Sequence, residues 1–182
     1  HLQRAIELNP RDARAHQRLG MIYVRGRRLQ EALKHFQKVA KLEPNSAEAH
    51  YRVGLALYQL RRYDDAIEVL RGSVKLAPQK LELSNLLAWI LATHGGTSKS
   101  EAAEAVKLAE QVAEQTDRKN SMYLDTLAAA YAASGQFDEA AKTARQAISL
   151  VLKTESKDQD SLASMRDRLR RYQKRQPYVE EK

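Results

Sequence analysis

The feature that most restricts how this chain can fold is an internal repeat of 34 residues. A triplet of Leu, any residue and Pro recurs at positions 8–10, 42–44 and 76–78. Between two such triplets the apolar residues have the spacing of two helices, expected at 13–23 and 31–42 in the first period. Each period is therefore expected to form a helical hairpin. Because one hairpin cannot bury its apolar face alone, the hairpins are expected to stack one on the next.

Small residues recur where the two helices of a hairpin have to approach each other. Gly20 and Gly54 occupy equivalent positions of two first helices, and Ala32 and Ala66 equivalent positions of the helices that follow. A larger side chain would hold the helix axes apart. Two pairs have the spacing of a capping box at a helix start: Asn45 with Glu48, and Ser98 with Glu101.

Together these residues resemble the repeat of the tetratricopeptide repeat (TPR) family. The resemblance rests on Leu19, Gly20, Tyr23, Ala32, Phe36 and Pro44 in the first unit, and on Gly54, Tyr58, Ala66, Leu70 and Pro78 in the second. The third unit is degenerate, with Ala88 at the usual Gly and a turn lengthened at Gly95-Gly96, and the fourth returns to the pattern with Ala128, Tyr131 and Ala140. The resemblance covers residues 1–153. It implies an all-α, right-handed superhelical solenoid of antiparallel helix pairs with a concave face, and protein or peptide binding without catalysis.

We expect one solenoid domain over residues 1–182, with a helix that caps its C-terminal end. Its parts are the end of a truncated preceding repeat (1–12), repeat 1 (13–46), repeat 2 (47–80), the degenerate repeat 3 with its extended turn (81–118), repeat 4 (119–154), the capping helix (155–176) and the tail (177–182). In the capping helix, Leu162, Met165, Leu169 and Tyr172 share one face. Its other face is basic, with Arg166, Arg168, Arg170, Arg171, Lys174 and Arg175. The tail is expected to be extended and mobile, and docking of Tyr178 and Val179 on this molecule or a neighbour is the alternative.

The candidate binding residues lie on the stripe of each first helix that points away from the second helix. The repeat places them in two rows: Gln17, Tyr51 and Asn85, continued by Asp125, and Met21, Leu55 and Trp89, continued by Ala129. Aromatic and apolar groups beside an amide and a carboxylate suit an extended peptide or a helix of a partner protein. The alternative is that Met21, Leu55 and Trp89 pack between neighbouring repeats.

No residue pattern of an enzyme is present. The sequence has no Cys, and it contains no H-E-x-x-H, G-x-x-x-x-G-K or G-x-S-x-G motif. His16 and His50 are one period apart, so we interpret them as packing residues rather than as metal ligands. We therefore expect a protein that is not an enzyme, with no catalytic residue, no cofactor and no metal site.

The basic residues provide a rival hypothesis, because the net charge is +8. Arginines cluster at two hairpin turns, 25–28 and 61–62, and along the capping helix. They permit electrostatic binding of nucleic acid or an anionic surface. A solvated basic face is the simpler interpretation, and the candidate rows show no base-reading code of the kind that helical-repeat RNA readers use. We therefore do not expect a nucleic-acid partner.

Two further hypotheses stay open at this point. Because the chain begins partway through a repeat, it is also interpreted as a spacer or regulatory appendage of a larger protein. The same N-terminal edge, where Leu2 and Ile6 lack their usual cover, predicts possible self-association. No apolar run is long enough to span a membrane. No feature identifies a compartment, so a soluble cytoplasmic domain is the default expectation.

Overall fold

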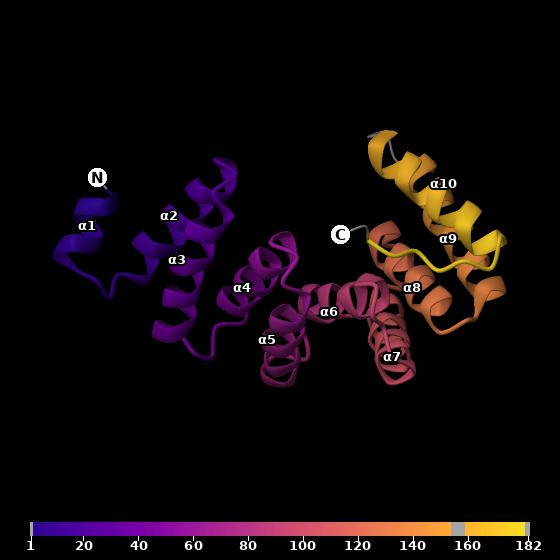
Figure 1. Ribbon diagram of the computed structural model, residues 1–182, viewed down its shortest axis with the longest axis horizontal. Coiled ribbons are helices and arrows are strands. Elements are labelled where there is room, and N and C mark those ends of the chain that lie inside the picture. Colours follow the sequence, from indigo (N-terminus) through magenta and orange to yellow (C-terminus); the bar gives the residue numbers. More distant parts are fainter. Residues whose placement is uncertain (1, 154–158, 181–182) are drawn as a thin grey trace. The chain divides into compact units, whose positions relative to one another are not determined.

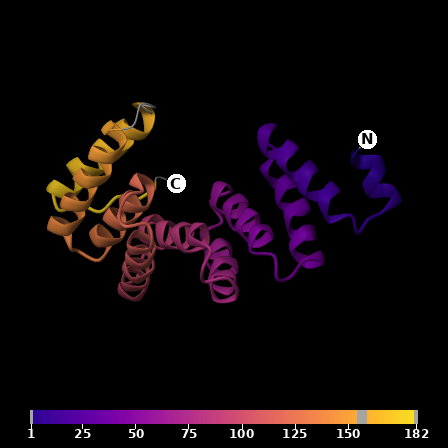
Figure 2. The same cartoon turned by 180° about the vertical axis from the view of Figure 1, so that it is seen from behind.

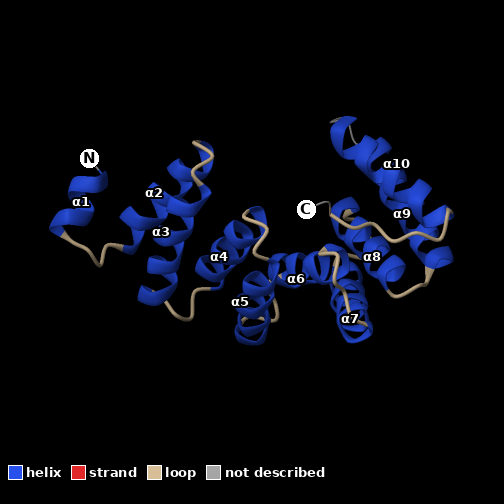
Figure 3. Ribbon diagram, in the orientation of Figure 1, coloured by secondary structure: helices blue, strands red, loops and turns tan. Residues whose placement is uncertain are grey.

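The structure, a computed structural model, describes residues 2–153 and 159–180 (Figure 1). Within these residues it contains ten helices and no strand (Figure 3). The chain divides into two compact units, one that ends at Leu83 and one that starts at Ser84.

The first unit is a series of helices in which each packs against the next one along the chain. They are α1 (Leu2–Leu8), α2 (Ala13–Arg25), α3 (Leu29–Leu42), α4 (Ala47–Gln59) and α5 (Tyr63–Leu76). Figures 1 and 2 show that α2 and α3 form one helical hairpin and α4 and α5 the next. The apolar stripes of these helices form the core, where Phe36, Leu57 and Leu70 are buried. Both hairpins that the period predicts in this unit are therefore present.

Two glycines allow the helices of these hairpins to touch, as the sequence predicts. A Cβ atom on Gly20 would lie 2.5 Å from Cε1 of Phe36, and one on Gly54 would lie 2.6 Å from Cδ2 of Leu70. Both distances are far below van der Waals contact. Any larger residue at these two positions therefore has to displace a buried side chain of the second helix.

The turn within each hairpin places one residue in the left-handed backbone conformation. These residues are Arg27 (φ 56°), Arg61 (φ 58°), Gly95 (φ 80°) and Gly135 (φ 82°). They occupy the same repeat position, if the six-residue insertion after the third turn is allowed for. The sequence predicts only that Gly95 lengthens a turn. The structure adds that Gly95 occupies a backbone position that glycine adopts without steric cost.

In the second unit, one helix is enclosed by three others. The unit contains most of α6 (Leu81–Thr93) and all of α7 (Lys99–Gln115), α8 (Ser121–Ala133), α9 (Phe137–Lys153) and α10 (Gln159–Gln173). Helices α7, α9 and α10 all pack on α8, so every residue of α8 from Tyr123 to Ala132 is buried.

One of the two predicted capping boxes is confirmed. The Ser98 hydroxyl accepts a hydrogen bond from the backbone N–H of Glu101, whose carboxylate accepts one from the backbone N–H of Ser98. The other prediction is wrong by one residue. Ser46 rather than Asn45 caps α4, and its Oγ accepts a hydrogen bond from the backbone N–H of Ala49.

Helix α10 packs on α9 and α8, as a capping helix should. Leu162, Met165 and Tyr172 are buried, as predicted. Arg168 is an exception, because the sequence places it with the basic outer residues, whereas the structure buries it. After α10 the chain passes through Arg175 in the left-handed conformation (φ 56°), and the following residues extend back to α6 (Figure 1). The docked tail, which is the alternative to a mobile tail, is the arrangement present in the structure.

Candidate functional site

In the first unit, two of the predicted residues line an apolar cavity of about 200 Å³. Met21 of α2 and Leu55 of α4 lie on its walls, together with the ring of Phe36. Both side chains are half-buried, so each still offers apolar surface to a ligand. The charged residues at the cavity are Arg25 and Arg52. The cavity therefore suits an apolar side chain that has an acidic neighbour.

Gln17 and Tyr51 flank this cavity along the sequence, one helical turn before Met21 and Leu55 respectively, but they do not line it. Both are half-buried. Tyr51 lies in a separate hollow of about 120 Å³, which Glu48 and Glu82 also line. Burial raises the pKa of the Tyr51 hydroxyl, and these two carboxylates raise it further. Tyr51 therefore stays a neutral donor at neutral pH.

In the second unit, Asn85 carries an unused acceptor. Its side-chain Oδ1 is buried, and no described residue donates a hydrogen bond to it. Buried acceptors are seldom left without a partner in a native protein. Asn85 lies one helical turn before Trp89 on α6, so the two residues share a helix face.

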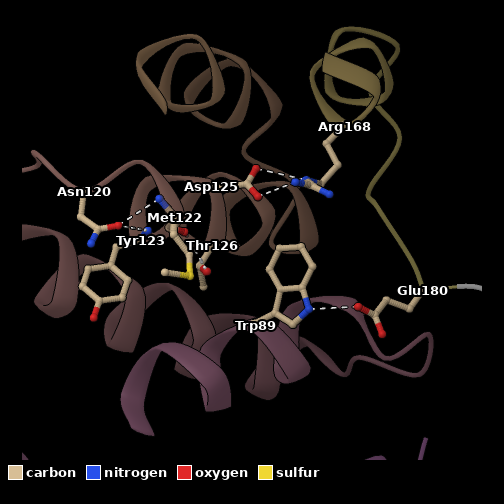
Figure 4. A network of polar contacts seen from close by, with 8 residues as sticks. All are labelled: Trp89, Asn120, Met122, Tyr123, Asp125, Thr126, Arg168 and Glu180. Atoms are coloured by element: carbon tan, nitrogen blue, oxygen red, sulfur yellow. Dashed lines mark hydrogen bonds and ion pairs between the residues drawn. The ribbon is translucent and has the colours of Figure 1, made fainter. Parts of the chain in front are cut away.

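Trp89 contacts the tail of its own chain (Figure 4). Its indole Nε1–H donates a hydrogen bond of 3.0 Å to the carboxylate of Glu180. The Tyr178 ring lies 5.9 Å from the Trp89 ring, centroid to centroid. The Arg168 guanidinium lies 5.3 Å from the Trp89 ring and 5.4 Å from the Tyr178 ring. One cation is therefore placed against both aromatic rings.

Asp125 holds that cation in place. Arg168 donates two hydrogen bonds to the Asp125 carboxylate, at 3.1 and 2.5 Å, and both side chains are buried (Figure 4). Burial raises the pKa of Asp125, and Arg168 opposes part of that rise. The carboxylate is thus occupied by Arg168 and acts on the Trp89 region through it.

The tail also bonds to the end of α6. The backbone N–H of Glu180 donates to the carbonyl oxygen of Thr93 at 2.9 Å. The last carbonyl groups of a helix have no partner within the helix, so an extended segment can use them as acceptors. Val179 packs so closely against the next loop that a Cβ atom on Gly95 would lie 3.0 Å from its Cγ1.

Sequence reasoning missed Arg168, Tyr178 and Glu180 as members of a site. Arg168 could have been found from its spacing, because it follows Met165 by three residues and precedes Tyr172 by four. That spacing places it on the buried face of α10. The contacts of Tyr178 and Glu180 with α6 have no local sequence pattern that indicates them.

The repeated histidines have a structural role in the first unit. His16 Nε2 lies 3.2 Å from the carbonyl oxygen of Pro10, and His50 Nε2 lies 2.8 Å from that of Pro44. Each ring therefore bonds the proline of the triplet before it, which accounts for their spacing of one period. Among the described residues, no group of three His, Cys, Asp or Glu side chains is placed to hold a metal ion.

Part of the basic surface is paired with acids. Arg28 contacts Glu31 at 2.8 Å, and Arg62 contacts Asp65 at 2.6 Å. The hydrogen bond from Arg28 lowers the pKa of Glu31. On α10, Arg170 and Arg171 both bond Asp167. No helix in the described part of the chain is long and apolar enough to cross a membrane.

Stacked helical hairpins with such surfaces define a helical-repeat protein, and the comparisons with known proteins specify the family. Two family models, both described as tetratricopeptide repeat, match residues 1–47 and 18–80 in one case and 124–158 in the other. Because these matches together cover more than half of the chain, it belongs to the tetratricopeptide repeat family. No curated protein matches the chain significantly.

Solved structures agree with this assignment. MamA 41-end from Desulfovibrio magneticus RS-1 is 22% identical, with a TM-score of 0.67 over 90% of this chain and 88% of that one. YrrB, described as a TPR protein with an unusual peptide-binding site, is 21% identical, with a TM-score of 0.70 over 91% and 80% of the two chains. TTC0263, a thermophilic TPR protein in Thermus thermophilus, is 20% identical, with a TM-score of 0.67 over 94% and 87%. These similarities confirm the α-α superhelical TPR fold that the sequence predicts.

Proposed function

We propose that this chain is a noncatalytic scaffold that binds a partner polypeptide on the exposed faces of its first helices, α2, α4, α6 and α8. Proteins with the TPR fold generally mediate protein–protein interaction and are generally not enzymes. The observation that carries the proposal is the docked tail. An extended segment lies against Trp89, the central residue of the predicted rows, through a ring contact and hydrogen bonds.

The other predicted residues support the proposal in different ways. Met21 and Leu55 line an open apolar cavity in the first unit, and Gln17 and Tyr51 lie one turn before them. In the second unit Asn85 has a free acceptor for a backbone or side-chain donor, and Asp125 fixes the arginine beside Trp89. The peptide-binding site named for YrrB, a structural neighbour, is consistent with the same use of this fold.

The experiment that tests this function is a selection of random displayed peptides on the full chain. Peptides that bind are expected to lose at least about tenfold in affinity on Leu55→Glu, because a charge would enter the apolar cavity. Ile22→Glu is the matched control, because Ile22 is a neighbour of Met21 on α2 but is 50% exposed and lies outside the cavity. The proposal is contradicted if no peptide is enriched, or if the enriched peptides bind both variants and the original chain equally well.

Electrostatic binding of nucleic acid or an anionic surface is supported by no comparable contact. Several of the arginines on which it would depend are paired with acids one helical turn away. Self-association through α1 stays a prediction, for which Leu2 and Ile6 are both half-buried.

A further inference from the structure

We propose that the surface formed by Trp89, Arg168 and the carbonyl end of α6, which we call the Trp89 surface, binds a particular class of peptide. Its ligand is an extended segment of a partner protein with an aromatic residue followed two positions later by a carboxylate. Residues 177–180 of this chain occupy the surface as a competing internal ligand. This inference rests on the proposed function and narrows it to one surface and one ligand chemistry.

The aromatic requirement follows from the position of Arg168. Its guanidinium lies between about 5 and 6 Å from two ring centroids at once, and Asp125 prevents it from moving away. One of those rings, Trp89, belongs to the surface, and the other, Tyr178, belongs to the tail. A cation held against one aromatic face attracts a second aromatic ring in preference to an aliphatic group. The ligand is therefore expected to supply a Tyr, Phe or Trp at this place.

The carboxylate requirement follows from the indole of Trp89. An indole N–H is a donor only, so it selects an acceptor. Glu180 supplies that acceptor, and its backbone N–H bonds the carbonyl oxygen of Thr93. One residue thus makes a side-chain bond and a main-chain bond, which together fix the direction and register of the segment. Tyr178 and Glu180 are two residues apart, so in an extended segment both side chains point to the same side.

The tail is bound weakly enough to be exchanged. Val179 remains 42% exposed, and Tyr178 is only half-buried. By contrast, Tyr172 in α10 is 1% exposed and belongs to the core. Pro177 separates the tail from α10, so the tail can leave the surface without unwinding that helix. A contact of this size closes the surface without being required for the fold.

Tethering sets the size of the expected competition. A short flexible tether holds its segment near the surface at an effective concentration on the order of 1 mM. If the same segment, added as a free peptide, has a Kd of about 100 μM, the tail occupies the surface in about ten molecules of eleven. Removing the tail contacts is then expected to tighten the binding of a free peptide about tenfold.

The chain provides its own probe, because Trp89 is its only tryptophan. In the full chain, Tyr178→Ala and Glu180→Gln are each expected to shift the Trp89 emission to longer wavelength and to increase its quenching by acrylamide. Glu139→Gln is the control, because it removes the same charge from an exposed position in α9 and is expected to leave the spectrum unchanged. Circular dichroism should show the same helix content in all variants.

Binding is then measured by fluorescence polarisation with a fluorescein-labelled peptide of the sequence of residues 176–182. The Tyr178→Ala chain is expected to bind it about tenfold more tightly than the original chain. Adding Trp89→Ala should abolish that binding. A peptide with Ala at its aromatic position is expected not to compete.

Three results would overturn the inference. The first is no binding of the peptide to the Tyr178→Ala chain at about 1 mM, the effective concentration of the tail. The second is a spectral change without any peptide binding, since the tail would then be a structural cap only. The third is a dimer in sedimentation that Tyr178→Ala dissolves, since tails would then be exchanged between copies. In each case, peptides selected on the cavity at Met21 and Leu55 would still bind if the proposed function is right.

Discussion

Replacing Arg168 by Met tests the arrangement beneath the Trp89 surface. In the Arg168→Met variant, the Asp125 carboxylate would stay buried, at 7% exposed, and would lose both hydrogen bonds that it accepts from Arg168. Removing one partner of a buried ion pair leaves an uncompensated charge, which typically costs about 3–5 kcal/mol. We therefore expect the free energy of unfolding to fall by about that amount at pH 7.

The loss should depend on pH in a defined direction. Burial already raises the pKa of Asp125, and Arg168 is the group that opposes the rise. Without Arg168 the pKa in the folded state rises further above its value of about 3.9 in the unfolded chain. A raised carboxyl pKa stabilises the fold at low pH, and that stabilisation is lost as the pH rises through the folded-state pKa. The deficit of the variant is therefore expected to shrink as the pH is lowered from 7 to 5.

Urea unfolding followed by Trp89 fluorescence and by circular dichroism measures this loss. The double variant Asp125→Leu with Arg168→Met is the control, because replacing both charges by apolar groups is often close to neutral. It should recover most of the stability that the single variant loses. A loss below about 1 kcal/mol at pH 7, typical of a surface ion pair, would refute the reasoning. So would a deficit that does not change between pH 7 and pH 5.

Two further predictions concern the first unit. Gly54→Ala is expected to lower the free energy of unfolding by about 1–3 kcal/mol because its Cβ would collide with Leu70, whereas Gly72→Ala in α5, where a Cβ meets no atom within 4 Å, should raise it by about 0.5–1 kcal/mol; equal effects in urea unfolding would contradict both distances. Burial, with a smaller effect of the neighbouring His16, lowers the pKa of His35, so the unfolded chain takes up the proton first and stability should fall as the pH drops below about 6.5. His35→Gln should weaken this dependence, and an unchanged slope of unfolding free energy against pH would count against the assignment.

The hairpins could be predicted from sequence because their determinants are local and repeated. The period places Gly20 and Gly54 against the second helices, and the structure shows that a Cβ would not fit at either. Helix caps are predictable to within about a residue. Asn45 and Ser46 are adjacent, and both residue types are good caps. Only the backbone geometry decides that Ser46 is used.

The contacts of the Trp89 surface could not be predicted, because they join distant parts of the sequence. Asp125 and Arg168 are 43 residues apart, and Trp89 and Glu180 are 91 apart. The repeat correctly selects Trp89 and Asp125 as neighbours of one surface, but it stops before α10 and the tail. Arg168 was grouped with its basic neighbours because composition dominates over phase in a short helix. Its spacing from Met165 and Tyr172 is the better guide to its burial.

The central claim is that the indole of Trp89 holds an extended segment, and nuclear magnetic resonance tests it most directly. The chain has one tryptophan, so it gives a single indole N–H signal. We predict nuclear Overhauser contacts from that signal to Glu180 and from the indole ring to Tyr178 in the full chain. The same signal should move when Tyr178→Ala is introduced, and move back when the peptide of residues 176–182 is added. An indole signal with no contact to the tail, unchanged by the substitution and by the peptide, would contradict the account.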